Sequence, residues 1–147
     1  MNRFTEAVSG GVAPLVLLAG LAGCATTQEP SLKAVYHINQ GLEQATNGLR
    51  NIRNHLTADP HAKITVVTHA AGIDFLLEGA KDKNGNPYDA TVQDLVSKGV
   101  DFRVCNFTLL SRKIDRERVI PEATIIPSGV AEVAKLQATE HYVYVKP

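Results

Sequence analysis

Short runs of apolar and β-branched residues recur along this chain, and after most of them the apolar spacing changes to that of a helix. The clearest run is Ile64–Thr68, which lies between the turn-prone pairs Asp59-Pro60 and Ala71-Gly72 and is typical of a buried strand. The runs are 34–38, 64–68, 100–104, 123–126 and 142–145. Such alternation predicts an α/β fold in which helices cover both faces of a mostly parallel sheet.

The segments between these runs have helical spacing or turn composition. Apolar residues from Leu42 to Leu56 are spaced by three and four, which predicts an amphipathic helix. We also expect a turn or short helix over 73–80, a surface loop over 81–87, and helices from a cap at Asp89 to Gly99, from a cap at Asn106 to Arg112, and from Ser128 to about Thr139. The chain is thus expected to form a single-domain three-layer sandwich with a five-stranded sheet, whose edge includes the last run.

The N-terminus has the order of a secretion signal. Arg3 lies near the start, and Gly10–Gly23 then form an uncharged apolar stretch that is too short to cross a bilayer, which needs roughly 20 residues. Leu21-Ala22-Gly23-Cys24 resembles the lipobox of bacterial lipoproteins, in which the cysteine is lipidated and becomes the new N-terminus. The alternative is an ordinary signal that ends by chance in a cysteine. We expect a signal peptide over 1–23, a lipidated tether over 24–31 and the domain over 32–147.

This resemblance implies a location as well. A lipidated Cys24 would hold the protein at the periplasmic side of a bacterial membrane, and Ala25, which is not Asp, favours the outer membrane. Fifteen basic and fifteen acidic residues balance, so we expect no binding to nucleic acid. The sequence has no CxxC or HxxxH spacing and no glycine-rich phosphate loop, so we expect neither a metal nor a cofactor.

Cys105 is the residue best suited to covalent chemistry. The chain has two cysteines, and lipidation of Cys24 would leave Cys105 as the sole thiol. It leaves a predicted strand and enters a predicted helix, where N–H groups stabilise a thiolate. His69 follows another strand and could pair with it, and Arg103 and Arg112 could add positive potential. A small hydrophobe packed at a strand end is the other interpretation, and both remain open.

The stretch Gly99–Cys105, followed by Leu109, Arg112 and Ile114, resembles the DsrE/DsrF-like sulfur-relay family. The similarity extends over Lys33–Pro147 and includes Ile125–Val130, although many relatives have Arg-Gly where this chain has Arg112-Lys113. The resemblance implies that Cys105 carries sulfur as a persulfide, with a sulfur donor and a thiol acceptor as partners. It also implies a homo-oligomer, either a trimer or a hexamer.

Three functions follow from these observations. The leading hypothesis is a membrane-anchored sulfur carrier or sulfurtransferase-like protein, in which Cys105 accepts sulfur and His69 or Arg112 assists. The second is a non-enzymatic oligomeric binding or scaffold lipoprotein with an inert, buried cysteine. The third is a Cys/His hydrolase, which requires His69 to act as the base for Cys105.

Overall fold

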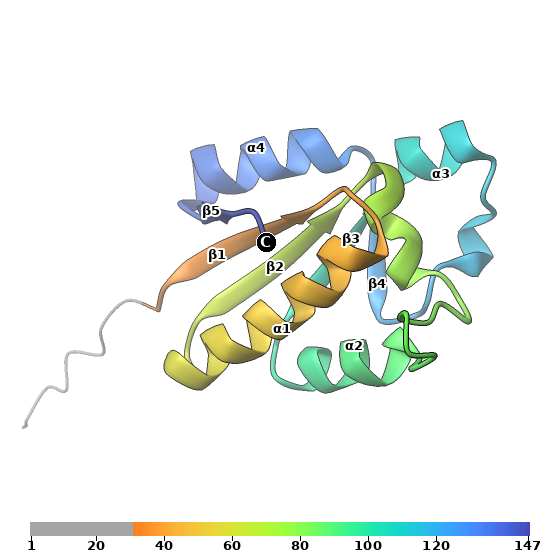
Figure 1. Cartoon of the computed structure of the whole chain (residues 1–147). Coiled ribbons are helices and arrows are strands. Elements are labelled where there is room, and N and C mark those ends of the chain that lie inside the picture. Colours follow the sequence, from red (N-terminus) through yellow and green to blue (C-terminus); the bar gives the residue numbers. More distant parts are fainter. Residues whose placement is uncertain (1–30) are drawn as a thin grey trace, which may run out of the picture.

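The computed structural model describes residues 31–147, so the predicted signal peptide and Cys24 lie outside the described residues. Five parallel strands form one sheet in the order β4-β3-β2-β1-β5 (Figure 1). They are β1 (Lys33–Ile38), β2 (Lys63–Thr68), β3 (Asp101–Cys105), β4 (Ala123–Ile126) and β5 (Val143–Val145). The predicted α/β class and five-stranded sheet are confirmed, and the last strand lies at an edge, as expected.

The helices follow the predicted order, with different starting residues in two cases. They are α1 (Leu42–Ala58), η1 (Ala70–Leu76), α2 (Tyr88–Ser97), α3 (Asn106–Arg112), η2 (Arg116–Arg118) and α4 (Gly129–Glu140). The caps predicted at Asp89 and Asn106 are wrong, because Pro87 and Cys105 hold these positions. Ser128 does cap α4, since its hydroxyl accepts the N–H of Ala131. Among the described residues, no helix is both long and apolar enough to span a bilayer.

The direction in which the chain crosses the sheet explains which face each helix covers. From β1 to β4 each strand is laid down beside the previous one, and α1 and α2 pack on the same face (Figure 1). The chain then returns from β4 to β5 at the opposite edge, in the reverse direction. Because crossovers between parallel strands are right-handed, α4 must cross the other face. We call these the α1 face and the α4 face.

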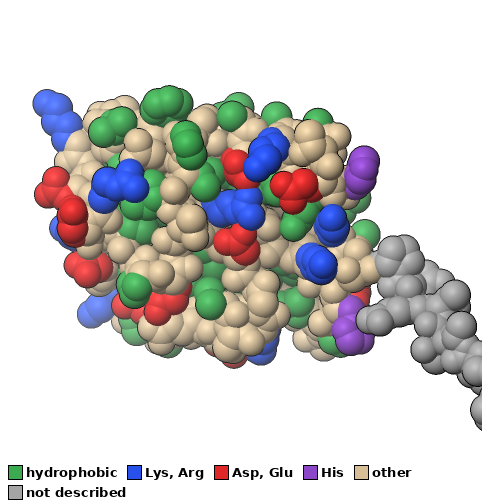
Figure 2. Space-filling view, turned by 180° about the vertical axis from the view of Figure 1, so that it is seen from behind, with side chains coloured by type: hydrophobic (Ala, Val, Ile, Leu, Met, Phe, Trp, Pro, Cys, Tyr) green, Lys and Arg blue, Asp and Glu red, His purple; other side chains and the backbone are tan. Residues whose placement is uncertain are grey.

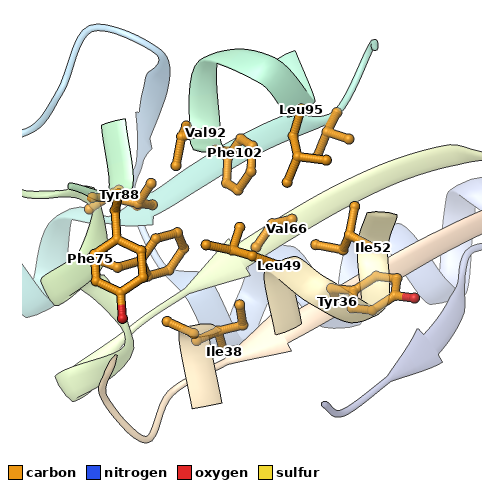
Figure 3. Close-up of a cluster of buried hydrophobic side chains, with 14 of the residues drawn as sticks. Tyr36, Ile38, Leu49, Ile52, Val66, Phe75, Tyr88, Val92, Leu95 and Phe102 are labelled. Carbon is orange, nitrogen blue, oxygen red and sulfur yellow. The ribbon is translucent and has the colours of Figure 1, made fainter. Parts of the chain in front are cut away.

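The two faces carry different amounts of apolar core. The α1 face holds the main cluster, in which the Phe75 ring lies edge-on to both Tyr88 and Phe102 (Figure 3). The α4 face holds four fully packed apolar residues, Val35, Val67, Val133 and Leu136. Most of the stabilising apolar burial therefore lies on the α1 face.

Lys113 resolves the departure from the family pattern noted in the sequence. It is the C-cap of α3 and has a left-handed backbone with φ of 52°. Glycine is favoured in this conformation, because a Cβ there costs about 1 kcal/mol or more. The chain thus makes the left-handed turn after α3 with a lysine.

Candidate functional site

The carboxyl ends of β3 and β4 are where this sheet is expected to bind or react. After β3 the chain packs into the main core through Leu109 and Ile120, whereas after β4 it enters α4 on the opposite face. Adjacent strands whose connections leave to opposite faces form a crevice at their carboxyl ends. Cys105 ends β3 opposite Ile126, which ends β4, so the cysteine lies at this point.

Cys105 is enclosed by the starts of two helices. It is the N-cap of α3 and only 5% exposed. Gly129, the first residue of α4, has no side chain at a place where a Cβ would lie 3.3 Å from the Cβ of Cys105 and 3.1 Å from the carbonyl oxygen of Thr68. Because of this close approach, the N-terminal end of α4 also faces Cys105.

The surrounding donors favour the thiolate. Burial by itself raises the pKa of the Cys105 thiol, but the N–H of Gly129, the hydroxyl and N–H of Thr108 and the N–H of Phe107 outweigh it, so the pKa lies below its ordinary value. The Cys105 side chain makes no regular capping hydrogen bond to α3. The site therefore stabilises negative charge on sulfur through several weak donors.

His69 lies beside Cys105 but is bonded to another histidine. A Cβ on Gly129 would lie 3.1 Å from the Cβ of His69, so the two side chains begin on either side of this glycine. The His69 Nε2 lies 2.7 Å from the Nε2 of His37, whose Nδ1 lies 2.8 Å from the Tyr144 hydroxyl. Among the hydrogen bonds of residues 31–147, none joins His69 to Cys105. As the structure has it, His69 faces His37.

Neutral forms of these histidines are favoured. Burial, followed by the charges of His69 and Lys146, lowers the pKa of His37, and burial followed by Lys146 lowers the pKa of His69. A hydrogen bond between two Nε2 atoms also requires one ring to donate and the other to accept. The pair is therefore expected to be uncharged at neutral pH.

The two candidate arginines have other partners. Arg103 pairs with Asp101 and with Glu132 of α4, which ties that helix to the sheet. The Arg112 Nη1 donates to the Ala70 carbonyl oxygen at 3.1 Å and to the Asp74 Oδ1 at 2.6 Å. Neither guanidinium therefore has the sulfur as its partner in the described hydrogen bonds.

Sequence reasoning missed part of this site. It assigned His37 no role, but the parallel register of β1 and β2 brings His37 and His69 together. Thr108 was not considered, although its spacing of three from a strand-end cysteine was a usable signal. No three side chains of His, Cys, Asp or Glu converge as a metal site within residues 31–147.

Two solved structures are similar to this chain. The protein of unknown function MTH1491 from Methanobacterium thermoautotrophicum is 25% identical, with a TM-score of 0.71, and the match covers 80% of this chain and all of that one. The ychN protein from E. coli is 17% identical with a TM-score of 0.66, over 79% of this chain and 99% of that one, and supports the fold. A comparison with curated proteins gave no match.

A family model gives the assignment directly. The model of the DsrE/DsrF-like family matches residues 30–146, which is most of the chain. The family is associated with sulfur relay. The match extends from before β1 to after β5, so it includes every strand of the sheet. The chain belongs to the DsrE/DsrF-like family.

Proposed function

We propose that this protein carries sulfur as a persulfide on Cys105. The observation that carries the proposal is the enclosure of Cys105 by the starts of α3 and α4, where donors lower the pKa of its thiol. Membership in a family associated with sulfur relay supports it. A thiolate, not a thiol, is the nucleophile in sulfur exchange, so an environment that favours the thiolate suits this chemistry.

The transfer needs no further group from the chain. The Cys105 thiolate attacks the sulfane sulfur of a donor such as a polysulfide, an S–S bond forms, and the donor's own S–S bond breaks to release a shorter polysulfide anion. An acceptor thiolate then attacks the outer sulfur and Cys105 leaves as the thiolate. Residues 31–147 contain no second cysteine, so the acceptor is a partner protein or a small thiol.

The test is the intact mass after exposure to polysulfide or thiosulfate. The full chain carrying Cys24→Ala leaves Cys105 as the only thiol, and we expect it to gain sulfur that a reductant removes. The matched variant with Cys105→Ser should gain none. A Cys105 that resists polysulfide and alkylation until the protein is unfolded would contradict the proposal.

That last outcome is what the second candidate function requires. The 5% exposure of Cys105 is also compatible with an inert packed cysteine in a binding or scaffold protein. The hydrolase is disfavoured, because His69 is bonded to His37 instead of to the sulfur. The hydrolase hypothesis would be supported if the protein hydrolysed esters in a substrate panel and this activity were lost in both Cys105→Ser and His69→Gln.

We further propose that the chain works as a homo-oligomer, a trimer or a hexamer. Figure 2 shows hydrophobic side chains gathered along the upper edge, over α3 and the start of α4. These two elements carry Phe107, Leu110 and Val130, which are 61% to 65% exposed. Such a patch is typical of an interface. Sedimentation should give a multiple of the chain mass that Leu110→Glu reduces, and an unchanged monomer would contradict this.

Anchoring by lipid is the remaining part of the proposal. Leu21-Ala22-Gly23-Cys24 supports lipidation at Cys24 and a periplasmic location, and Ala25 favours the outer membrane. In a bacterial host, labelled fatty acid should be incorporated into the wild-type chain and not into Cys24→Ala. Fractionation of the two membranes should recover the labelled protein in the outer one. Label at equal levels in both proteins would contradict anchoring through Cys24.

A further inference from the structure

Ala70 has a backbone conformation that needs an explanation. It directly follows His69 at the end of β2, is exposed, and has φ of 50°, in the left-handed region that a non-glycine residue rarely occupies. The conformation costs about 1 kcal/mol or more, so the surrounding contacts must hold it. No buried side chain of Ala70 supplies these contacts, since the residue is exposed.

Two hydrogen bonds from α3 hold the Ala70 peptide groups. The Ala70 N–H donates to the Oγ1 of Thr108 at 3.0 Å, and the Ala70 carbonyl accepts from the Nη1 of Arg112 at 3.1 Å. Arg112 also binds the Asp74 carboxylate of η1 at 2.6 Å. Ala70 is thus fixed on both sides by α3, the helix whose N-cap is Cys105.

The first of these bonds limits where the Thr108 hydroxyl can donate its proton. Thr108 is 8% exposed, so its hydroxyl has little access to water. A hydroxyl has a single proton, and an oxygen that already accepts an N–H directs that proton elsewhere. The described hydrogen bonds of residues 31–147 assign this proton no acceptor, so it is free to donate to a nearby group. In the third helical position after an N-cap, it lies one turn from the Cys105 sulfur.

We propose that Arg112, Ala70 and Thr108 form a chain that ends at the Cys105 sulfur: Arg112 holds Ala70, Ala70 orients the Thr108 hydroxyl, and the hydroxyl donates to the sulfur. Thr108 is then the contact residue. Arg112 is a positioning residue that acts only through Ala70. This proposal adds detail to the proposed function. It rests on that function for the role of Cys105 as the sulfur carrier. The low pKa of the Cys105 thiol, to which the Thr108 hydroxyl contributes, agrees with it.

The experiment follows the thiolate without requiring sulfur transfer or access to the site. The full chain carrying Cys24→Ala is titrated by the ultraviolet absorbance of the thiolate, and the same chain with Cys105→Ser is subtracted for the tyrosines. Thr108→Val keeps the shape of the side chain and removes the hydroxyl, so the midpoint of the thiolate titration should move to higher pH. The thiolate fraction at neutral pH should fall about tenfold. Thr108→Ser keeps the hydroxyl and should stay near the parent.

Arg112→Gln separates positioning from a direct charge effect. It should move the midpoint in the same direction by less than Thr108→Val does, and added to Thr108→Val it should have no further effect. A shift in the double variant equal to the sum of the two would show that Arg112 acts on the sulfur directly and would overturn the chain. An unchanged midpoint in Thr108→Val would overturn it too.

The outcomes are distinguishable from failure of the proposed function. Thr108→Ala serves if Thr108→Val does not fold, and circular dichroism checks each variant. If Cys105 takes up no sulfur while these variants shift the midpoint, the persulfide proposal is wrong and the chain stands. If Cys105 takes up sulfur while the midpoints coincide, the chain is wrong and the persulfide proposal stands.

Discussion

The two faces of the sheet differ in what their side chains do. The α1 face carries one continuous apolar cluster with Phe75 and Phe102 at its centre. The α4 face carries little apolar core and holds the ionisable groups instead: Cys105, His37, His69 and the Arg103–Glu132 pair. Stability and chemistry are therefore separated on opposite sides of the same strands, and residues that alternate along one strand serve different purposes.

The largest expected effect is on the α1 face. Phe102→Ala should lower the free energy of unfolding by about 3–5 kcal/mol, because it removes a buried ring and leaves a cavity. Val66 and Val67 provide a matched test, since they are neighbours in β2, are both fully buried, and face opposite sides. Urea unfolding should show a greater loss for Val66→Ala than for Val67→Ala. Equal losses would contradict the conclusion that the α1 face contributes more to stability than the α4 face.

Gly129→Ala tests how closely α4 approaches the site. The new Cβ would lie 3.1 Å from the Thr68 carbonyl oxygen and 3.3 Å from the Cys105 Cβ, so the start of α4 must shift. We expect a loss of about 1–3 kcal/mol in stability and a higher pKa of the Cys105 thiol, because the Gly129 N–H moves away. Ala138→Ser, at an exposed position further along α4, should change neither. An unchanged thiol titration in Gly129→Ala would show that the helix is not a donor.

The ion pair that ties α4 to the sheet should have a smaller effect. Glu132→Gln removes the less exposed of the two carboxylates bound to Arg103 and should cost about 1–2 kcal/mol in urea unfolding. Asp101→Asn, at a more exposed partner of the same guanidinium, should cost less than about 1 kcal/mol. The reverse order would mean that the contact to the exposed partner matters more than the tie to α4.

The histidine pair on the α4 face predicts that the stability of the protein depends on pH. Burial and Lys146 lower the pKa of both rings in the folded state, so the unfolded chain takes up protons first as the pH falls. The stability is complete above the unfolded pKa of about 6.5 and decreases below it. Unfolding measured between about pH 7 and pH 5 should show a smaller loss in His37→Phe. If the free energy of unfolding changed equally with pH in the wild-type protein and in His37→Phe, the predicted effect of the histidine pair would be contradicted.

The fold was predictable because burial leaves a regular trace in a sequence. Ile64–Thr68 is β-branched and lies between turn residues, which favours a buried strand, and the three- and four-residue spacing after Leu42 favours a helix face. Helix starts were less reliable, as Asp89 and Asn106 show, because a polar residue suits both the cap and the first turn.

The site was only partly predictable because its contacts depend on strand order and register. Cys105 was found from its place at the end of a strand. The bond between His37 and His69 needed the pairing of β1 with β2, and the approach of Gly129 needed the return of the chain across the α4 face. Neither is encoded in spacing along the chain.

The pairing of β5 with β1 has a consequence for how the protein is made. Ala34 lies opposite Val143, so the outer edge of the first strand stays open until almost all of the sheet's sequence has been synthesised. Contacts that distant form late, and an open strand edge invites pairing with other chains. A chain truncated after α4 would leave this edge of β1 without its partner strand and should aggregate more readily than the full chain.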